Sequence, residues 1–457
     1  MGHGMSQQPE YESALAVFTA VEQQNISELF QNIAGVNPIS FNADQLQAHL
    51  KDRLPPALIV RLHNQLSNVL HKDEGEKRGR NTHVWKEAFV VGLSHCLKGT
   101  LTQRAQVFLR LATDKEYATT AELVHLMVHL LNAYMNLMTF TPQFKSWNLK
   151  HDDESNKELA TFLMEELIND NMDQYFEHDL ERWLLRSAFV AHVVDYVFNK
   201  CFPISHIEDV HVHTMLQQPK IPYCRGVNWD ETSSVLSLTS LILLNHSIPQ
   251  QVSNQWKLLF NSNLHGASFA TMLKLIMNKG PSLLIIKDKN GAIFGGFAPE
   301  SWAVNPQYYG STSCFLFTIH PKVGRYFPTG YNENYMYLNQ MQQTLPNGLG
   351  FGGQLWYFGL WLDSEFGKGQ SRAEPKCTTF GSPQLSAEPD FEVDTIEVWG
   401  VGAATLEGED QVKTSILDKD PAAKALLSLA GREMVSEGLR ETDATAHTPS
   451  EHNLHHE

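Results

Sequence analysis

The densest group of metal-binding residue types lies between residues 201 and 224. It holds His206, His211 and His213, with Cys201 and Cys224 at its two ends. A His-x-His pair on a strand can present both imidazoles to zinc. No four-ligand zinc spacing emerges, however, and a chain with 21 histidines produces such clusters by chance. We interpret the group as linker surface, and a metal site is the alternative.

A glycine-rich run, Gly348-Leu-Gly-Phe-Gly-Gly353, has the composition of a dinucleotide-binding loop. Such a loop follows a strand and opens a helix within a βαβ unit. Here the aromatic segment Leu355–Leu362 follows, with the pattern of a strand rather than a helix. The glycines therefore predict turns between antiparallel strands, and the sequence predicts no cofactor.

The sequence contains little that indicates nucleophilic catalysis. The chain has no Gly-x-Ser-x-Gly elbow, no Walker A loop and no His-Glu-x-x-His helix. Cys314 lies in an apolar strand pattern, and Cys377 precedes Thr-Thr-Phe. His265 could be a base, but it equally well ends a helix or makes a buried hydrogen bond. We predict no catalytic residues, and an unidentified catalytic site stays open as the alternative.

Composition narrows the class of protein. A length of 457 residues suggests two or three domains, and 42% hydrophobic residues are ample for packed cores. The net charge of -16 argues against nucleic-acid binding, which needs clustered Lys and Arg. Five scattered cysteines without a CxxC pair indicate a reducing compartment. No apolar run is long enough to span a membrane, and no signal peptide is evident.

The first six residues, Met1-Gly-His-Gly-Met-Ser6, fit the pattern for N-myristoylation of Gly2. A single myristoyl chain binds a membrane only marginally, and stable anchoring takes a second signal. The next basic residue is Lys51, so no polybasic segment supplies that signal. We therefore expect residues 1–12 to be an acylated tail that needs a protein partner at the membrane.

Residues 13–215 predict a compact all-α domain, because apolar residues recur there at helical spacing. Within it, Thr82–Glu87 and Ala118–Val124 resemble the exit from an EF-hand calcium loop. A calcium loop needs oxygen ligands at alternate positions and Gly at the sixth. Counting back from Glu122 places Leu111 first and Glu116 sixth. The prediction is EF-hand-like helix pairs that bind calcium weakly or not at all. The longest predicted helices are Trp85–Leu97, Gln103–Thr113, Thr120–Met138, Lys157–Ile168 and Leu180–Phe198.

A Pro-rich linker is predicted over 216–232, and the pattern then changes. Helices are expected over Gln251–Phe260 and Ser268–Met277, followed by short strands punctuated by Gly, Pro and Asn. Lys287-Asp-Lys-Asn-Gly291 places Asn-Gly between two apolar strands, which is a strong hairpin signal. Two packed antiparallel sheets flanked by helices fit residues 233–402. The whole fold is predicted to be α+β.

After Gly402 the composition becomes acidic. Within residues 403–440, Asp420-Pro421 predicts the start of a helix that runs to about Leu439. Its apolar stripe is a candidate partner-binding face, and packing of the helix on its own TLDc domain is the alternative. Residues 441–457 predict a disordered tail. The candidate contact residues are Leu426, Leu427, Leu429 and Met434.

The motifs of residues 233–402, in this order, resemble the TLDc domain family. The resemblance covers roughly 170 residues and implies a β-sandwich with flanking helices. The motifs are Trp256-Lys-Leu-Leu-Phe260, Ser262-Asn-Leu-His-Gly266, Gly291-Ala-Ile-Phe-Gly-Gly-Phe297, Gly350-Phe-Gly-Gly353, Leu360-Trp-Leu-Asp363, Cys377-Thr-Thr-Phe380 and Ile396-Glu-Val-Trp-Gly400.

The whole-chain plan is similar to the lysosomal, mTOR-linked branch of that family rather than to its oxidation-resistance or nuclear-receptor-coactivator branches. The resemblance implies an interaction protein that binds the vacuolar proton pump (V-ATPase) through its TLDc domain. It also implies a link to mTOR signalling on the cytoplasmic face of the lysosomal membrane. The alternative from the same family is an enzyme or a factor protecting against oxidative stress.

Overall fold

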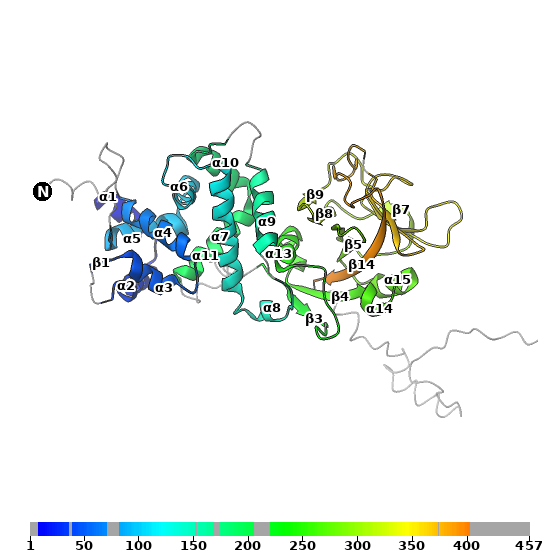
Figure 1. Cartoon of the computed structure of the whole chain (residues 1–457), viewed down its shortest axis with the longest axis horizontal. Helices are drawn as coiled ribbons and strands as arrows, with labels where there is room; N and C mark the ends of the chain where they lie inside the picture. Colours follow the sequence, from blue (N-terminus) through cyan, green and yellow to red (C-terminus); the bar gives the residue numbers. More distant parts are fainter. Residues whose placement is uncertain are drawn as a thin grey trace, which may run out of the picture. The chain divides into compact units, whose positions relative to one another are not determined.

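The computed structural model describes residues 8–35, 39–70, 82–150, 153–167, 173–204, 220–372 and 374–402. Residues up to Gly402 form one compact unit. Helices come first along the chain, coloured blue to green in Figure 1, and a part rich in strands follows, coloured green to orange. Gly2, the three linker histidines and the C-terminal stripe all lie outside the described residues.

None of the described helices is long and apolar enough to cross a bilayer.

The helical half is built from two sets of paired helix–loop–helix units. The elements are α1 (Gln8–Ala16), α2 (Ala20–Ala34), β1 (Ser40–Phe41), α3 (Ala43–Leu50), α4 (Pro56–Asn68), β2 (Val84–Trp85), α5 (Lys86–Lys98), α6 (Leu101–Ala112), α7 (Thr120–Met138), α8 (Pro142–Lys145), α9 (Asp153–Glu165), α10 (Glu177–Arg186) and α11 (Ala188–Cys201).

Backbone pairing joins the loops of each set. β1 and β2 pair antiparallel, which links the α2–α3 loop to the α4–α5 loop. An antiparallel bridge between Ala118 and Tyr175 links the α6–α7 loop to the α9–α10 loop in the same way. Loops paired across a short ladder are the arrangement expected of EF-hand-like helix pairs.

The prediction of one helix over Leu180–Phe198 was wrong. The segment forms α10 and α11, which are separated by Ser187 with a non-helical backbone. Ser187 closes α10 by donating its N–H to the carbonyl of Trp183, and it precedes the first turn of α11. The apolar spacing is continuous across this break, so periodicity alone could not place it.

The strand-rich half contains most of the glycine and aromatic motifs. Its elements are β3 (Tyr223–Arg225), α13 (Leu238–Ser247), the 3-10 turn η1 (Gln250–Val252), β4 (Gln255–Asn261), α14 (Ser262–His265), α15 (Phe269–Ile276), β5 (Ser282–Asp288), β6 (Ile293–Ala298), β7 (Asn305–Tyr309), β8 (Phe315–His320), β9 (Gly324–Tyr326), β10 (Met336–Asn339), β11 (Gly348–Phe351), β12 (Leu360–Asp363), β13 (Lys368–Gln370) and β14 (Asp390–Val401).

The long strand β14 joins two sheet halves. The order is β7-β10-β11-β12-β13-β14-β5-β6-β8-β9, with β4 paired to β14 and β3 paired to β4. The start of β14 pairs with β13, and its second half pairs with β5 and β4. The Asn290-Gly291 turn connects β5 to β6 as predicted. All of these pairs are antiparallel except β3–β4.

The two halves of the sheet pack face to face, as the predicted sandwich requires. Their shared core includes Leu284 and Leu316 from one half and Leu349 and Phe351 from the other. A Cβ at Gly296 would lie 3.0 Å from the Phe351 ring. Only glycine therefore allows β6 to approach β11 so closely, which explains one residue of the Gly-Gly-Phe motif.

The expected helix over Gln251–Phe260 was also wrong. Residues Gln255–Asn261 form the strand β4, which lies between β14 and the parallel strand β3. Only a short 3-10 turn precedes it. Pairing on both edges satisfies the backbone of this segment, so tertiary context decides its conformation.

Four tryptophans connect the helical half to the strand-rich half. The Trp147 ring lies 5.9 Å from Trp256 and 5.1 Å from Trp399, and Trp229 lies 5.9 Å from Trp147. The Trp147 indole donates to the carbonyl oxygen of Pro222 at 2.8 Å. The two halves therefore share a buried core.

Candidate functional site

The cysteines at the ends of the histidine cluster are buried and free. Burial raises the pKa of the Cys201 and Cys224 thiols to about 12, so both stay protonated near neutral pH. A protonated thiol is a poor zinc ligand. Across the described residues, no group of three or more His, Cys, Asp or Glu side chains is placed to hold a metal.

The predicted turn glycines form a strand and a turn instead of a loop alone. Gly348–Phe351 is β11, which pairs with β10 and β12. A Cβ at Gly350 would lie 2.7 Å from the Phe358 ring. Gly352 and Gly353 then turn the chain with positive φ angles of 68° and 76°. The run packs aromatic rings and has no helix after it, so it cannot cradle a phosphate as a dinucleotide loop does.

The remaining nucleophile and base candidates have structural partners. Burial raises the pKa of the Cys314 thiol well above its usual value, and the thiol donates to the carbonyl oxygen of Phe297. Cys377 is also buried. His265 accepts the backbone N–H of Asn261 at its Nδ1 atom, 3.0 Å away. The Cys314 thiol is therefore not arranged as an activated nucleophile, because activation requires a lowered pKa or an adjacent base.

The motif residue Glu397 is the most highly connected buried carboxylate of the strand-rich half. Its Oε2 accepts from the Ser234 hydroxyl at 2.7 Å and the Trp399 indole at 2.9 Å. Its Oε1 accepts from the Val235 amide at 2.8 Å and the Asn261 amide group at 3.4 Å. Burial raises the pKa of this carboxyl despite these donors. Glu397 therefore connects the domain entry, which is the segment containing Ser234 and Val235, to strands β14 and β4.

The loop carboxylate singled out by the EF-hand comparison caps a helix. Both Glu122 oxygens accept at the start of α7, from the Thr119 backbone and hydroxyl and from the Thr113 hydroxyl. The Lys115 ammonium lies 3.6 Å from the same carboxylate. These hydrogen bonds keep the pKa of Glu122 low although burial opposes them. Weak or absent calcium binding stays a prediction, and the capping box gives it a physical basis.

An exposed aromatic turn follows β11. Leu355 and Phe358 pack inward on the outer face of the β10–β12 sheet, beside Tyr337. Trp356 and Tyr357 stay 60% and 61% exposed. Trp356 has a φ of 73°, a backbone conformation that is uncommon for a bulky residue. This strained turn holds two large aromatic side chains out of the core.

Polar contacts tie this turn to two neighbouring loops. The Asn334 amide group donates to the Gly353 carbonyl at 2.7 Å, and the Thr379 hydroxyl accepts from the Gly353 N–H at 2.8 Å. The same hydroxyl donates to Asn332 at 2.7 Å. Tyr331, which is 79% exposed, lies beside Asn332. We call Tyr331, Trp356 and Tyr357 the aromatic surface, and the three loops hold it in place.

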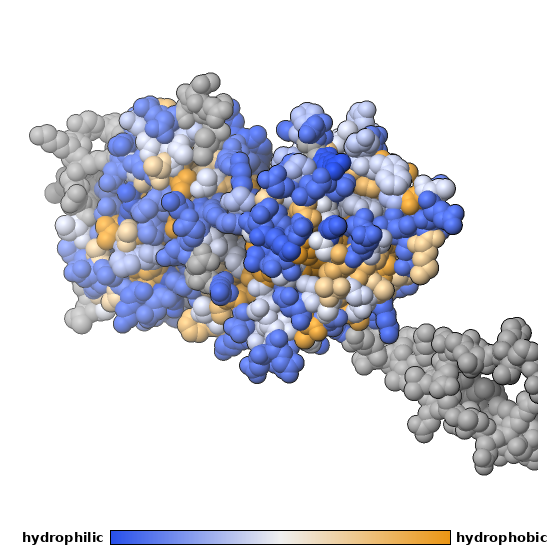
Figure 2. Space-filling view, turned by 45° about the vertical axis from the view of Figure 1, so that its right-hand side comes forward, coloured by the Kyte–Doolittle hydropathy of each residue, from blue (hydrophilic) through white to orange (hydrophobic). Residues whose placement is uncertain are grey.

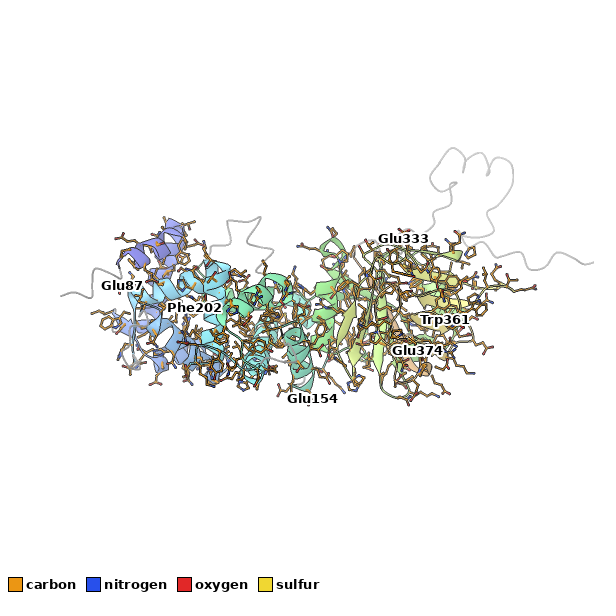
Figure 3. All side chains as sticks on the ribbon, turned by 90° about the horizontal axis from the view of Figure 1, so that it is seen from above. Glu87, Glu154, Phe202, Glu333, Trp361 and Glu374 are labelled. Carbon is orange, nitrogen blue, oxygen red and sulfur yellow. The ribbon has the colours of Figure 1, made fainter. Side chains whose placement is uncertain are left out.

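Charge is scarce in the stretch of sequence that carries the aromatic surface. From Tyr326 to Leu362 the only charged residue in the sequence is Glu333. Figure 3 labels Glu333 at one edge of the strand-rich half, away from Trp361 and Glu374. Figure 2 shows hydrophobic residues interspersed with polar ones on one face of this half. Few charges with enriched Tyr, Trp and Met are typical of the centre of a protein–protein interface.

The TLDc domain model matches residues 229–402. MTOR-associated protein MEAK7 of Gallus gallus is 35% identical over 96% of this chain and 98% of its own length. The Homo sapiens MEAK7 protein is 36% identical over 93% of this chain and 96% of its own length. This chain belongs to the TLDc family.

Other TLDc proteins match a smaller part. Oxidation resistance protein 1 of Xenopus laevis is 34% identical over 41% of this chain and 21% of its own length. The similarity to the MEAK7 proteins therefore includes the EF-hand-like half, and the similarity to the oxidation-resistance protein does not extend over the whole chain.

The sequence did not identify which loop side chains of the TLDc domain face solvent. The structure shows that Tyr331, Trp356 and Tyr357 are exposed. One signal in the sequence was available, namely the long stretch with a single charge at Glu333. It could not show which aromatics face outward, because Phe358 and Trp361 of the same stretch are buried.

Proposed function

We propose that this TLDc protein is a non-enzymatic regulator that binds the vacuolar proton pump (V-ATPase) at the lysosomal membrane and is linked to mTOR signalling. The observation that carries the proposal is the similarity, over 96% of the chain, to a protein named as MTOR-associated. The exposed aromatic surface supports a docking role for the TLDc domain. Burial raises the pKa of the Cys314 thiol, which argues against thiol-based peroxide chemistry at that residue.

The second candidate is a function in oxidative-stress resistance. Similarity to Oxidation resistance protein 1 over 41% of the chain favours it. An enzyme of this kind would need an activated group in a cleft. Turnover of hydrogen peroxide by the purified full chain, lost when Cys314 and Cys377 are replaced by Ser, would favour this candidate over the first.

Replacing Trp356 and Tyr357 together by Ala is expected to reduce pump binding at least tenfold. Hot-spot residues of interfaces are enriched in Trp and Tyr, and truncating one costs about 2 kcal/mol or more of binding free energy. The measurement is recovery of pump subunits from lysosomal membranes by the tagged full-length protein. Phe140→Ala is the matched control, because Phe140 is 78% exposed but lies in the helical half. Equal recovery by both variants would contradict docking through the aromatic surface.

Gly2→Ala is expected to move the protein from the membrane fraction to the soluble fraction, because it removes the proposed acylation site. The shift should be partial if the TLDc domain still binds the pump, since one acyl chain adds only marginal affinity. Fractionation with mass spectrometry of the N-terminal peptide makes the measurement. Absence of a myristoyl mass on wild-type protein from eukaryotic cells would rule the acylation out.

The proposed C-terminal helix is a second contact with the pump. Leu426→Glu combined with Leu429→Glu is expected to weaken pump recovery and leave the melting temperature unchanged. Each such side chain contributes roughly 1.5–3 kcal/mol when it is buried in a partner groove. Thr445→Glu with Thr448→Glu is the control for added charge in the same region. A fall in melting temperature with unchanged pump recovery would contradict the proposal.

A further inference from the structure

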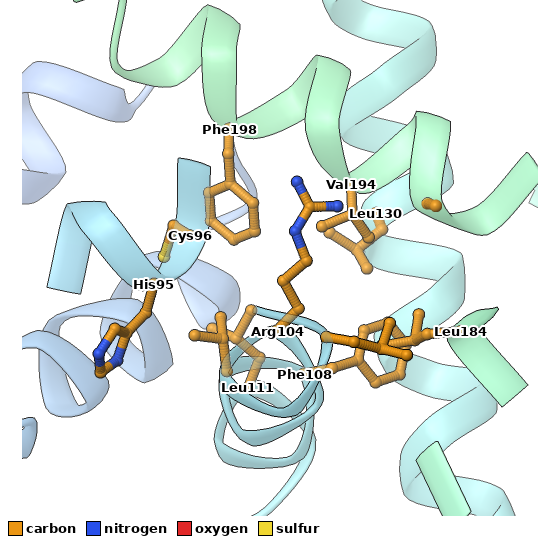
Figure 4. Close-up of a pocket in the computed structure, with 12 residues that line it drawn as sticks. His95, Cys96, Arg104, Phe108, Leu111, Leu130, Leu184, Val194 and Phe198 are labelled. Carbon is orange, nitrogen blue, oxygen red and sulfur yellow. The ribbon is translucent and has the colours of Figure 1, made fainter. Parts of the chain in front are cut away.

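An apolar cavity lies inside the helical half, between α5, α6, α7, α10 and α11. It encloses about 30 Å³. Phe198, Val194 and Leu130 surround one part of it, and Phe108 and Leu184 surround another (Figure 4). A space lined in this way favours a hydrocarbon group over a polar ligand.

One charged side chain reaches the cavity, and it is already neutralised. Arg104 extends from α6 towards α11 between Phe198 and Val194 in Figure 4. Its guanidinium lies 2.7 Å from the carboxylate of Asp195. The cavity therefore offers no unpaired cation to a fatty-acid carboxylate, and an acyl chain carried on an uncharged amide fits this lining better.

The first described helix, α1, packs against α5, which supplies His95 and Cys96 to the cavity wall. The charge of Glu10 on α1 acts on His95, raising a pKa that burial lowers more strongly. Gly2 precedes Gln8, the first residue of α1, by six positions. Six extended residues span about 20 Å, which is the reach of an acylated Gly2 from the start of α1.

We propose that this cavity binds the end of the acyl chain attached to Gly2, an inference that rests on the proposed acylation. The enclosed volume of about 30 Å³ accommodates the terminal methyl end, since it exceeds the roughly 10–15 Å³ that one water molecule needs. The methylenes before it lie along the half-buried Leu101, Ala191 and Val194 at the mouth. A chain held there is withheld from the membrane, so the cavity controls how much of the protein is free to anchor.

Filling the mouth separates cavity binding from acylation. Ala191→Trp places an indole among the lining residues, whereas Ala188→Trp, on an exposed position one turn earlier in α11, is the matched control. Full-length protein is produced with N-myristoyltransferase, and its mass is verified. We expect myristoylated Ala191→Trp to bind phosphatidylcholine vesicles at least tenfold more tightly than wild type, and Ala188→Trp to bind like wild type. Equal binding by all three acylated proteins overturns the cavity proposal and leaves the acylation standing.

An added ligand tests the cavity without the modification. N-myristoylglycine amide is titrated by calorimetry into unacylated full-length protein. Wild type and Ala188→Trp should bind it, and Ala191→Trp should bind at least tenfold more weakly, with the smaller Ala191→Leu between them. Circular dichroism checks that each variant is folded. No binding to wild type overturns the proposal even if Gly2 is acylated in cells. Binding without a myristoyl mass on cellular protein overturns the Gly2 chain as its occupant.

Discussion

Replacing Glu397 by Ala is expected to lower the free energy of unfolding by about 3–5 kcal/mol. The change removes the acceptor of four hydrogen bonds and leaves the Ser234 hydroxyl, the Val235 amide and the Trp399 indole without their partner in a buried site. Each unsatisfied buried group costs about 1–3 kcal/mol. Denaturant unfolding of the full-length protein, followed by tryptophan fluorescence, measures the change.

Two further variants test the cause. Glu397→Gln retains one acceptor oxygen but places an NH₂ group against donors, so its destabilisation should be intermediate. Glu392→Ala removes an exposed carboxylate of the same strand that pairs with Lys289. That replacement should change the free energy of unfolding little, because exposed ion pairs contribute little to stability. If Glu397→Ala and Glu392→Ala prove equally stable, the buried carboxylate does not hold the domain entry in place.

Lowering the pH from 7 to 5 is expected to destabilise the protein through two buried histidines at the junction of its halves. Burial lowers the pKa of His192 to about 3, helped by Lys220 and His246. Burial likewise lowers that of His246 to about 4, helped by Arg325 and Lys220. In the unfolded chain both titrate near 6.5.

The sign follows from proton binding. Between pH 6.5 and the folded pKa values, the unfolded state binds more protons, so stability is present at neutral pH and is lost as the pH falls. At pH 5 the loss is about 2 kcal/mol for each histidine relative to pH 7. Geometry agrees with a neutral His192, because the Tyr134 hydroxyl accepts from the Lys220 amide at 3.0 Å and has its own proton left for His192 Nε2, 3.1 Å away.

The test compares the free energy of unfolding of wild type with that of the double variant His192→Gln, His246→Gln. Both proteins are measured at pH 7, 6 and 5. Glutamine keeps a hydrogen-bond acceptor but does not titrate in this range, so the double variant should show a flatter decline. His178→Gln, at an exposed position on α10, controls for loss of an imidazole and should follow the wild-type curve. A double variant with the full wild-type pH dependence would refute the assignment.

Local sequence patterns determined several elements well. Helices α4 and α7 follow runs whose apolar residues repeat at helical spacing, and the Asn290-Gly291 turn supplied the β5–β6 hairpin. The Thr119 to Glu122 spacing is that of a capping box, which the structure contains. These features depend on residues within one helical turn or one hairpin, so the local sequence is sufficient to predict them.

The sequence also identified the family, because the order of the motifs can be recognised without knowledge of any contact. The structural roles of the motif residues could not be derived from the sequence. Glu397 receives hydrogen bonds from Ser234 and Val235, which precede it by 163 and 162 positions. The motif glycine Gly296 is required by the nearness of Phe351 in the opposite sheet half. Both roles exist only once the sheet closes on itself.

The sequence by itself determined that this protein is α+β, with helix pairs before a TLDc domain. Tertiary structure alone decided that Gln255–Asn261 is a strand, since pairing on two edges outweighs a local helical pattern. It also decided that Trp356 faces solvent while Trp399 is buried among three other tryptophans. The physical reason is common to both cases: burial and strand pairing depend on residues far away in the chain, and a local pattern contains no information about which distant surfaces will meet.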